Sequence, residues 1–309
     1  MTLPKEVYKA HGMGNDFVIY IDLDNEFEPK PSQVRAICDR HFGVGADGLI
    51  RLTKKVQKDG SLRLFMDYSN KDGSLASMCG NGARVCALIA DIFNLVNMDN
   101  GGVFELGTRS GIKKIVRVKE GEYTMDMGVW NADQKRNFVV RLKGARTAEK
   151  TVTGRFVNVG NEHVVSDLIN KTNLSAGVRL SDLDLSQEPG VTMLLPSESG
   201  SLVKEVGTNF EFTEVDLTAK TIKMRVFERG VGETLSCGTG IVASAISAYL
   251  ATSQMLQQQP VDRWRVSVPG GNARVQIVEN HAFLTASALL VGKVVLNEYF
   301  SRGLLYANS

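Results

Sequence analysis

A chain of 309 residues, 43% of them hydrophobic, is long enough for two domains with well-buried cores. Its net charge of +2, with acidic and basic residues interspersed, excludes the basic stripe expected of a nucleic-acid-binding protein. The N-terminus is polar, no apolar run reaches membrane-spanning length, and four cysteines in so long a chain do not make a disulfide framework. We therefore expect a globular cytoplasmic protein without a nucleic-acid or membrane partner.

Short runs of β-branched and aromatic residues predict mainly strands with a few helices, which indicates an α+β fold. The predicted strands, in chain order, are Phe17–Ile21, Leu62–Tyr68, Ile112–Val118, Phe156–Val159, Phe210–Val215, Lys223–Phe227, Trp264–Val268 and Ala273–Val278. The predicted helices are Ser32–His41, Ala83–Phe93, Val164–Asn170 and Ile241–Leu250.

One glycine-rich stretch, Gly43–Gly48, matches the letters of the dinucleotide-binding fingerprint G-x-G-x-x-G. That fingerprint follows a strand and opens a helix, whereas here a predicted helix comes first and the strand-like Leu49–Thr53 follows. We interpret the stretch as a turn. The chain also lacks a phosphate-binding loop, an H-E-x-x-H zinc motif and a recognisable pyridoxal-lysine context, so we expect no cofactor and no metal.

Two cysteines, Cys79 and Cys237, lie in near-copies of one short motif. Met78–Gly82 reads M-C-G-N-G, and Ser236–Gly240 reads S-C-G-T-G. Each motif precedes an apolar, alanine-rich run that predicts a buried helix, so each cysteine is expected at a helix N-terminus. The dipole and the unpaired N–H groups at that end of a helix stabilise a thiolate. Two such thiols, one in each half, suggest one site at the junction of the halves.

The duplication extends beyond the cysteines. Strand-like segments lead into both cysteine turns, and a Gly-Asn pair opens an earlier strand-like segment in each half. The matched segments are Phe65–Lys71 with Lys223–Arg229, and Gly14–Ile19 with Gly160–Val165. We expect two domains, residues 1–135 and 136–288, each a mainly antiparallel sheet wrapped around a central buried helix. A linker is expected near Trp130–Lys143, where polar and charged residues cluster.

Two thiols suit a reaction that moves a proton across one carbon. A free thiol has a pKa of about 8.5, which a helix N-terminus lowers, so it carries protons well near neutral pH. If one thiolate removes a proton and the second thiol delivers a proton to the opposite face, the carbon inverts. The backbone N–H groups of Gly80, Asn81, Gly238 and Thr239 are candidates to bind a carboxylate at that carbon.

The sequence context separates the other cysteines, which are expected to pack in the core, from further residues with a possible functional role. Cys38 and Cys86 lie within apolar helical patterns and are expected to pack as small hydrophobic residues. His163 follows the repeated Gly-Asn pair and is a candidate functional residue. Glu228–Arg229 occupies the repeat position of Asn70–Lys71, which favours a functional role over that of a solvated surface pair.

Together, these motifs resemble those of the diaminopimelate epimerase family, pyridoxal-independent enzymes that interconvert LL- and meso-2,6-diaminopimelate. The resemblance spans nearly the whole chain in the same order. Its matching stretches are His11–Phe17, Asp39–Gly48, Asn70–Arg84, Gly160–His163, Glu228–Thr234, Cys237–Gly240 and Pro269–Gly271. It implies a cofactor-independent isomerase of lysine and cell-wall precursor biosynthesis, with two pseudo-symmetric domains, the active site between them, and residues 289–309 returning to the first domain. The oligomeric state stays open, with a homodimer as one expectation.

Carried over by position, the resemblance makes Cys79 and Cys237 the two catalytic bases, with His163 and Glu228 tuning the thiols. The turns Gly80–Asn81 and Gly238–Thr239 would bind the carboxylate at the reacting carbon of a small amino-acid substrate. The residues that the resemblance assigns to the rest of the substrate are Asn15, Asn70, Asn161, Asn209, Glu228 and Arg229.

The chain departs from the family pattern at several positions. Glu162 replaces a usual proline, Gly48 replaces a substrate-contacting glutamine of some members, and Lys71 replaces a small residue. The stretch Pro196–Gly207 lacks a His-Pro-rich segment, and Ala286–Ser287 stands in place of a Gly-Pro pair. These departures concern the distal part of the pocket and its loops rather than the cysteine motifs.

Three other functions are compatible with two such cysteines. A racemase of proline, hydroxyproline or another amino acid would use the same chemistry, but Glu228–Arg229 argues for a substrate with a second polar end. A thiol-disulfide redox protein commonly uses a C-x-x-C pair, which this chain lacks. The third is a non-catalytic amino-acid-binding protein, which would not exchange a substrate α-hydrogen with solvent.

Overall fold

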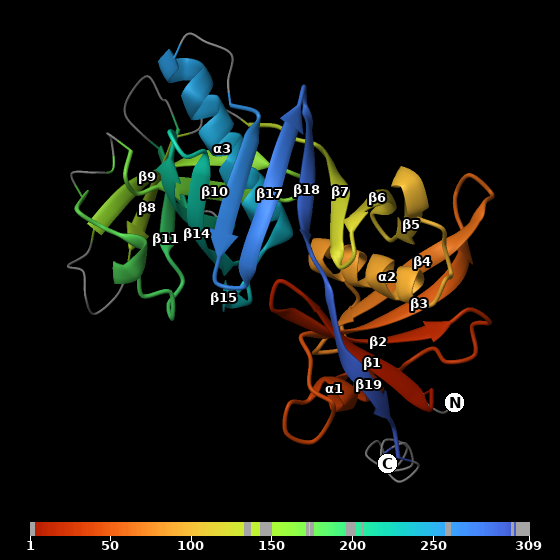
Figure 1. Cartoon of the computed structure of the whole chain (residues 1–309). Coiled ribbons are helices and arrows are strands. Elements are labelled where there is room, and N and C mark those ends of the chain that lie inside the picture. The colour runs from red at the N-terminus through yellow and green to blue at the C-terminus, as the bar shows by residue number, and fades with distance from the viewer. Residues whose placement is uncertain are drawn as a thin grey trace. The chain divides into compact units, whose positions relative to one another are not determined.

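The computed structural model describes residues 4–132, 137–142, 150–170, 173, 176–195, 202–205, 207–256, 261–297 and 300. Within them the protein is mostly strand with few helices, which confirms the predicted α+β class (Figure 1). The chain forms two compact units, Met1–Met125 with Ala286–Ser309, and Asp126–Thr285. The domain limits expected from the sequence stay a prediction, and part of the expected linker near Trp130–Lys143 lies outside the described residues.

The first unit is built from strands around a long helix. Its elements are β1 (Glu6–Gly12), β2 (Asn15–Asp22), α1 (Pro31–Cys38), β3 (Gly48–Val56), β4 (Leu62–Asn70), α2 (Gly80–Ile92), η1 (Asp99–Gly101), β5 (Val103–Thr108), β6 (Gly111–Lys119) and β19 (Leu289–Val295). The chain passes to the second unit within β7 (Glu122–Val129) and returns within β18 (His281–Ser287). β19 then pairs antiparallel with β1.

The second unit has a larger set of elements. They are β8 (Asn137–Leu142), β9 (Lys150–Asn158), β10 (Glu162–Asp167), η3 (Leu180–Asp182), β11 (Gly190–Leu195), β12 (Leu202–Glu205), β13 (Asn209–Asp216), β14 (Thr221–Glu228), β15 (Gly232–Thr234), α3 (Gly238–Leu256), β16 (Arg263–Val268) and β17 (Gly271–Val278). β8 pairs antiparallel with both β9 and β11, and β11 pairs antiparallel with β12.

The predicted internal repeat is visible in how the strands pair. In the first unit, β1–β2 is antiparallel, β2–β3 parallel, β3–β4 antiparallel, β4–β5 parallel and β5–β6 antiparallel. In the second unit, β9–β10, β10–β13, β13–β14, β14–β16 and β16–β17 follow the same alternation. Antiparallel pairs predominate in the first unit when β1–β19 and β6–β7 are included. The two halves of the chain therefore share one topology.

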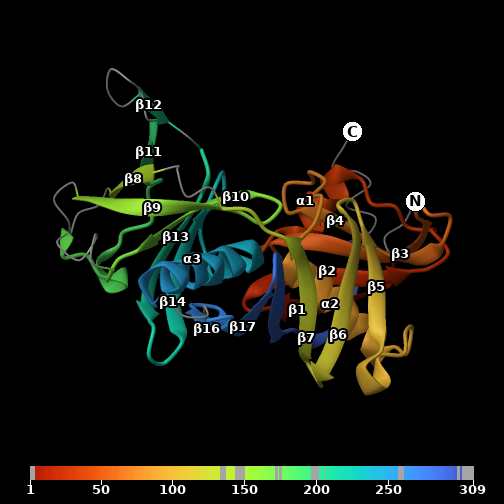
Figure 2. The same ribbon diagram turned by 90° about the horizontal axis from the view of Figure 1, so that it is seen from above.

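Each unit wraps its sheet around one apolar helix, as the two post-cysteine runs predict. Every residue of α2 from Asn81 to Ala90 is buried, and α2 contacts β1, β4, β5, β6 and β19 (Figure 1). α3 contacts β9, β10, β13, β14, β16 and β17 (Figure 2). A helix that is apolar on nearly all sides is stable only when it is enclosed in this way. None of the described helices combines the length and apolar character needed to cross a membrane.

Two local predictions need comment. The predicted helix Val164–Asn170 is wrong, because this segment begins with strand β10, which lies between β9 and β13. The residues from His163 to Ser166 are all buried, and a short run that is buried on both faces lacks the alternation that identifies a half-buried strand. The turn predicted at Gly43–Gly48 is confirmed: the Gly43 N–H donates to the carbonyl of Asp39 at 3.0 Å, and β3 follows.

Candidate active site

The two cysteines occupy equivalent positions in the two units. The carbonyl of Cys79 accepts a hydrogen bond from the N–H of Ala83 at 2.8 Å, and the carbonyl of Cys237 accepts one from Ile241 at 2.9 Å. These are the first hydrogen bonds of α2 and α3, so each cysteine is the residue directly before its helix. Neither cysteine forms a disulfide; Cys79 is partly exposed, whereas Cys237 is buried.

In the first unit, Cys79 lies in a chain of amide side chains. Its Sγ donates to Oδ1 of Asn15 at 3.5 Å, and the same oxygen accepts from Nδ2 of Asn81 at 3.3 Å. Nδ2 of Asn15 donates to Oδ2 of Asp47 at 2.9 Å. Two of the expected substrate-binding residues, Asn15 and Asn81, thus contact each other or the thiol.

In the second unit, Cys237 lies among hydrogen-bond donors and two carboxylates. Its Sγ is 3.4 Å from Oγ1 of Thr239, and it also accepts from the backbone N–H of Gly240. The pKa of the Cys237 thiol is raised well above its ordinary value, first by burial and then by the charges of Glu228 and Glu211. The donors of Thr239 and Gly240 act in the opposite direction. Burial and the two carboxylates thus outweigh the effect of the helix N-terminus that the sequence led us to expect.

Glu228 is itself perturbed by this environment. Burial is the largest influence and raises the pKa of its carboxyl. Oγ1 of Thr234 donates to Oε1 of Glu228 at 2.5 Å, and this hydrogen bond, together with one from Cys237, lowers the pKa in part. A carboxyl group with a raised pKa that is hydrogen-bonded to a thiol is suited to exchange protons with it.

His163 is completely buried and is held on both ring nitrogens. Nδ1 lies 2.7 Å from Oε1 of Glu211, and Nε2 lies 3.0 Å from Oδ1 of Asn161. Glu211 is also completely buried, and a Cβ at Gly240 would lie only 2.5 Å from its Oε1. Only glycine therefore fits at this point of α3, and the carboxylate of Glu211 joins His163 to the start of the helix that follows Cys237.

Asn209 and Arg229 meet at the ends of β13 and β14. Nδ2 of Asn209 donates to the carbonyl of Glu162 at 3.0 Å, and its Oδ1 accepts from the backbone N–H of Arg229 at 3.0 Å. Nη1 of Arg229 is 3.4 Å from the carbonyl of Gly207, and the side chain is exposed. Asn209 therefore fixes two backbone segments, and the guanidinium group of Arg229 remains accessible to a ligand.

Asn70 and Gly48 lie opposite each other in the β3–β4 register. Nδ2 of Asn70 donates to Oγ of Ser74 at 3.0 Å, within its own turn. A Cβ at Gly48 would meet the Tyr68 ring at 2.4 Å and the carbonyl of Ser69 at 2.6 Å. The backbone at position 48 thus leaves no room for the glutamine that some family members carry there.

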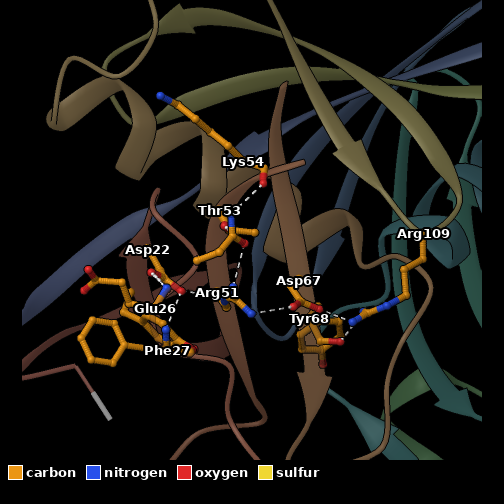
Figure 3. Close-up of polar contacts among 11 residues, drawn as sticks. Asp22, Glu26, Phe27, Arg51, Thr53, Lys54, Asp67, Tyr68 and Arg109 are labelled. Carbon is orange, nitrogen blue, oxygen red and sulfur yellow. Dashed lines mark hydrogen bonds and ion pairs between the residues drawn. The ribbon is translucent and has the colours of Figure 1, made fainter. Parts of the chain in front are cut away.

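Figure 3 shows a further set of charges that the sequence analysis did not identify. Nε of Arg51 donates to Oδ2 of Asp22 at 2.8 Å, and Nη1 of Arg51 is 3.7 Å from Oδ2 of Asp67. Asp67 also pairs with Arg109, whose Nη1 donates to the carbonyls of Tyr68 and Ala76 at 2.8 Å each. Ala76 lies three residues before Cys79, so this network ties the loop that leads to the thiol to the sheet.

Glu211 and Arg84 were not predicted from the sequence as site residues. Both are completely buried charged residues, a rare combination that marks function or a strong structural constraint. Glu211 alternates with apolar residues of β13 in a pattern that gives no indication of its partner. Arg84 is the one charge within the apolar stretch from Ala83 to Ala90 of α2, and that contrast was the available signal. Within the described part of the chain, no group of three or more His, Cys, Asp and Glu side chains is arranged to hold a metal ion.

Fold and site together define a class of protein in which two repeated α+β units each place a cysteine directly before a buried helix. A model of the diaminopimelate epimerase family matches residues 7–133 and 202–295. The chain belongs to the diaminopimelate epimerase family.

Individual relatives cover almost the whole chain. A diaminopimelate epimerase of Thermobifida fusca (strain YX) is 37% identical in an alignment of 299 positions that covers 92% of this chain and 95% of that protein. One from Corynebacterium glutamicum (strain R) is 34% identical, over 94% of this chain and 98% of that protein. A crystal structure of a phenazine biosynthesis protein of the PhzF family from Bacillus anthracis aligns with a TM-score of 0.64 and 16% identity, over 94% of this chain and 98% of that one. At that identity the likeness concerns the fold alone.

Proposed function

We propose that this protein is a diaminopimelate epimerase, which interconverts LL- and meso-2,6-diaminopimelate in lysine and cell-wall precursor biosynthesis. The observation that carries the proposal is the pair of equivalent cysteines, each directly before the buried helix of one repeated unit. Membership of the family and the match of relatives along more than nine-tenths of the chain support the same assignment.

The proposed chemistry is a proton transfer between two thiols and one α-carbon. One cysteine, as thiolate, removes the α-proton, and the thiol of the other delivers a proton to the opposite face. The first cysteine ends as thiol and the second as thiolate, so the protein is ready for the reverse reaction. The α-proton is much less acidic than a thiol, and about 1.36 kcal/mol must be supplied for each unit of pKa difference. The N–H groups of Gly80–Asn81 and Gly238–Thr239 would supply part of it by binding the substrate carboxylate.

The neighbours of Cys237 would help the thiol to change protonation state. Glu228 hydrogen-bonds to the thiol and has a raised pKa, so it can hold a proton close to the sulfur. His163 is oriented by Glu211 and Asn161 and adds a second titratable group to the same unit. We assign both residues to tuning of the catalytic thiols.

The distal end of diaminopimelate carries an ammonium and a carboxylate that must both be satisfied in a buried pocket. We assign the carboxylate to the exposed guanidinium group of Arg229 and the ammonium to Glu228. Asn15, Asn70, Asn161 and Asn209 would fill the remaining donor and acceptor positions. A site built for polar groups rejects a ligand that lacks them by as much as about 10⁴- to 10⁵-fold.

We also propose that the protein acts in the cytoplasm as a homodimer. Four cysteines that form no disulfide suit a reducing compartment. Exposed apolar side chains at Leu289, Val291 and Val295 alternate along β19 and offer a surface for a second copy. Light scattering on the eluting protein would report a mass of two chains if the dimer forms, and a mass of one chain would contradict this part of the proposal.

The decisive experiment is exchange of the substrate α-hydrogen in deuterium oxide without added pyridoxal phosphate. We expect LL-diaminopimelate to lose its α-proton signal in NMR spectra while the meso form appears. Lysine, alanine and proline serve as comparison substrates, and we expect little exchange with them. Arg229→Ala should remove most of the preference for LL-diaminopimelate over lysine. Exchange with proline but not with LL-diaminopimelate would instead indicate a different racemase, and no exchange at all would indicate a binding protein.

A further inference from the structure

Arg84 is a buried cation without a carboxylate. It lies in the second turn of α2 and has no exposed surface. Its Nη2 donates to Oδ1 of Asn81 at 2.5 Å, whereas Nε and Nη1 are buried with no hydrogen-bond partner among the described residues. Burial of an unpaired charge costs several kcal/mol, so a neighbouring negative charge is needed to offset it. Arg84 is not among the residues assigned to the substrate or to the proton transfer.

The contacts of Arg84 determine how the amides next to Cys79 are oriented. A guanidinium group can only donate, so Asn81 must present its oxygen to Arg84. An ionised carboxylate can only accept, so Asn15 must present its nitrogen to Asp47, which is also paired with Arg40. The two remaining amide atoms are then Nδ2 of Asn81 and Oδ1 of Asn15, and they meet as donor and acceptor at 3.3 Å.

This orientation leaves an acceptor facing Cys79. Oδ1 of Asn15 takes the hydrogen bond of the Cys79 thiol at 3.5 Å. If the Asn15 amide were turned over, the thiol would face its N–H₂ group instead. The chain from Arg84 through Asn81 and Asn15 therefore provides a partner for the protonated form of Cys79.

We propose that Arg84 is a positioning residue for Cys79. Arg84 aligns the Asn81 and Asn15 amides so that they accept the thiol hydrogen, and it supplies the buried positive charge that stabilises the thiolate. The inference rests on the proposed function, because a thiol that alternates between acid and base needs both forms to be accommodated. Burial lowers the pKa of Arg84 to about 10, and the charge of Cys79 acts in the opposite direction by favouring the charged guanidinium form. The cation and the thiolate thus stabilise each other.

The test is the pH dependence of iodoacetamide alkylation at Cys79 in the full-length protein, followed peptide by peptide with mass spectrometry. Arg84→Met keeps the length of the side chain and removes both the charge and the donors. We expect its Cys79 alkylation rate at pH 7 to fall about tenfold or more, since a neighbouring opposite charge moves a pKa by about 1–3 units. Cys237, in the other unit, is the internal reference and should keep its rate.

Two further variants separate charge from packing. Arg84→Lys keeps a cation but loses the planar fork, so we expect a smaller fall than in Arg84→Met. Leu88→Ala removes buried volume one turn further along α2, and its Cys79 pH profile should match the wild type. An unchanged Cys79 profile in folded Arg84→Met overturns the proposal, as does an equal shift in Leu88→Ala. Two other variants replace Arg84→Met if it fails to fold. In that case, the proposal is overturned when the pH profile of Cys79 alkylation is unchanged in both Arg84→Lys and Asn81→Leu.

The steady-state kinetics of the same variants test whether Arg84 also affects catalysis. We expect the kcat for LL-diaminopimelate to fall in Arg84→Met with a much smaller change in KM, because Arg84 has no exposed surface for a substrate to contact. The alkylation experiment needs no substrate. An inactive wild-type protein would therefore contradict the proposed function, whereas alkylation would still decide the role of Arg84.

Discussion

Nδ1 of His163 lies 2.7 Å from Oε1 of Glu211, and neither side chain has any exposed surface. The two residues come from the parallel neighbours β10 and β13, 48 positions apart in the chain. Oε2 of Glu211 is buried and has no hydrogen-bond partner among the described residues. The imidazole is therefore the main group that satisfies this carboxylate, and Glu211 in turn determines which ring nitrogen of His163 carries a proton.

We predict strong energetic coupling between these two residues. His163→Ala leaves the Glu211 carboxylate buried without its partner and should cost about 3–5 kcal/mol in the free energy of unfolding. In the double variant His163→Ala, Glu211→Gln, the buried charge is gone, so part of that loss should be recovered. Urea denaturation of the wild type, both single variants and the double variant gives the coupling energy. Additive effects within about 0.5 kcal/mol would contradict the prediction.

The four cysteines should divide into two pairs when each is replaced by alanine. Burial raises the pKa of Cys38 to about 12 and raises that of Cys86 further, so both stay protonated at neutral pH. Their alanine variants should keep most of the epimerase activity. Cys79→Ala and Cys237→Ala should each abolish net inversion, because one face of the carbon then lacks its proton donor or acceptor. The measurement is the rate of conversion of LL- to meso-diaminopimelate, and near-normal turnover in Cys237→Ala would contradict the two-thiol mechanism.

A pH-dependent loss of stability should arise at Asp167. Burial raises the pKa of its carboxyl from 3.8 to about 6. Between about pH 4 and pH 6 the folded state retains a proton that the unfolded state has released, so the free energy of unfolding falls as pH rises through this window. Asp167→Asn removes this titration and should be more stable than the wild type above pH 6, by up to about 3 kcal/mol. Below pH 4 the difference should vanish.

Urea denaturation at a series of pH values from 4 to 8 measures this difference. Asp24→Asn is the control, since it removes a carboxylate from the surface. The difference in the free energy of unfolding between Asp24→Asn and the wild type should not show the pH dependence expected for Asp167→Asn. If Asp167→Asn raises the free energy of unfolding as much at pH 4 as at pH 8, titration of the buried Asp167 carboxyl is excluded as the cause.

Two arginines on neighbouring strands should differ sharply in their contribution to stability. Arg51 is buried and pairs with Asp22, whose side chain is only 2% exposed. Arg51→Met leaves that carboxylate without its cation and should cost about 3–5 kcal/mol. Arg63 pairs with Asp59 and Glu105, which are 50% and 38% exposed, so Arg63→Met should cost about 0–1 kcal/mol. Thermal and urea denaturation test the contrast, and equal losses would contradict it.

Two strand glycines provide a matched test of local space. A Cβ at Gly48 would meet the Tyr68 ring and the carbonyl of Ser69, whereas nothing lies within 4 Å of a Cβ at Gly292. Gly48→Ala should therefore lose about 1–3 kcal/mol, and Gly292→Ala should stay within about 0.5 kcal/mol of the wild type. A stable Gly48→Ala protein would show that Tyr68 can move aside, and would reopen position 48 to a longer side chain.

The sequence predicted the features that depend on local pattern. Apolar runs after a glycine turn identified both helices, and the repeated motifs identified the topological repeat. Segment Val164–Asn170 failed because a fully buried strand lacks alternation. Glu211 and Arg51 could not be assigned partners, since their contacts join strands that are distant in sequence. The relation of Arg84 to Cys79 was hidden for a different reason, because it passes through two amides whose orientation only the structure reveals.

The polar groups around the two thiols are of opposite character, although the strands that position them follow the same order. Cys79 has amides and the buried cation of Arg84, whereas Cys237 has the carboxylates of Glu228 and Glu211. Under the proposed mechanism, the two proton tautomers of the resting site are then unequal in free energy, and the one in which Cys237 keeps its proton is preferred. The free protein is thus prepared for one epimer, and must redistribute a proton before it can accept the other. This bias leaves the equilibrium constant unchanged, and it makes the maximal rates in the two directions unequal where redistribution of the proton limits turnover.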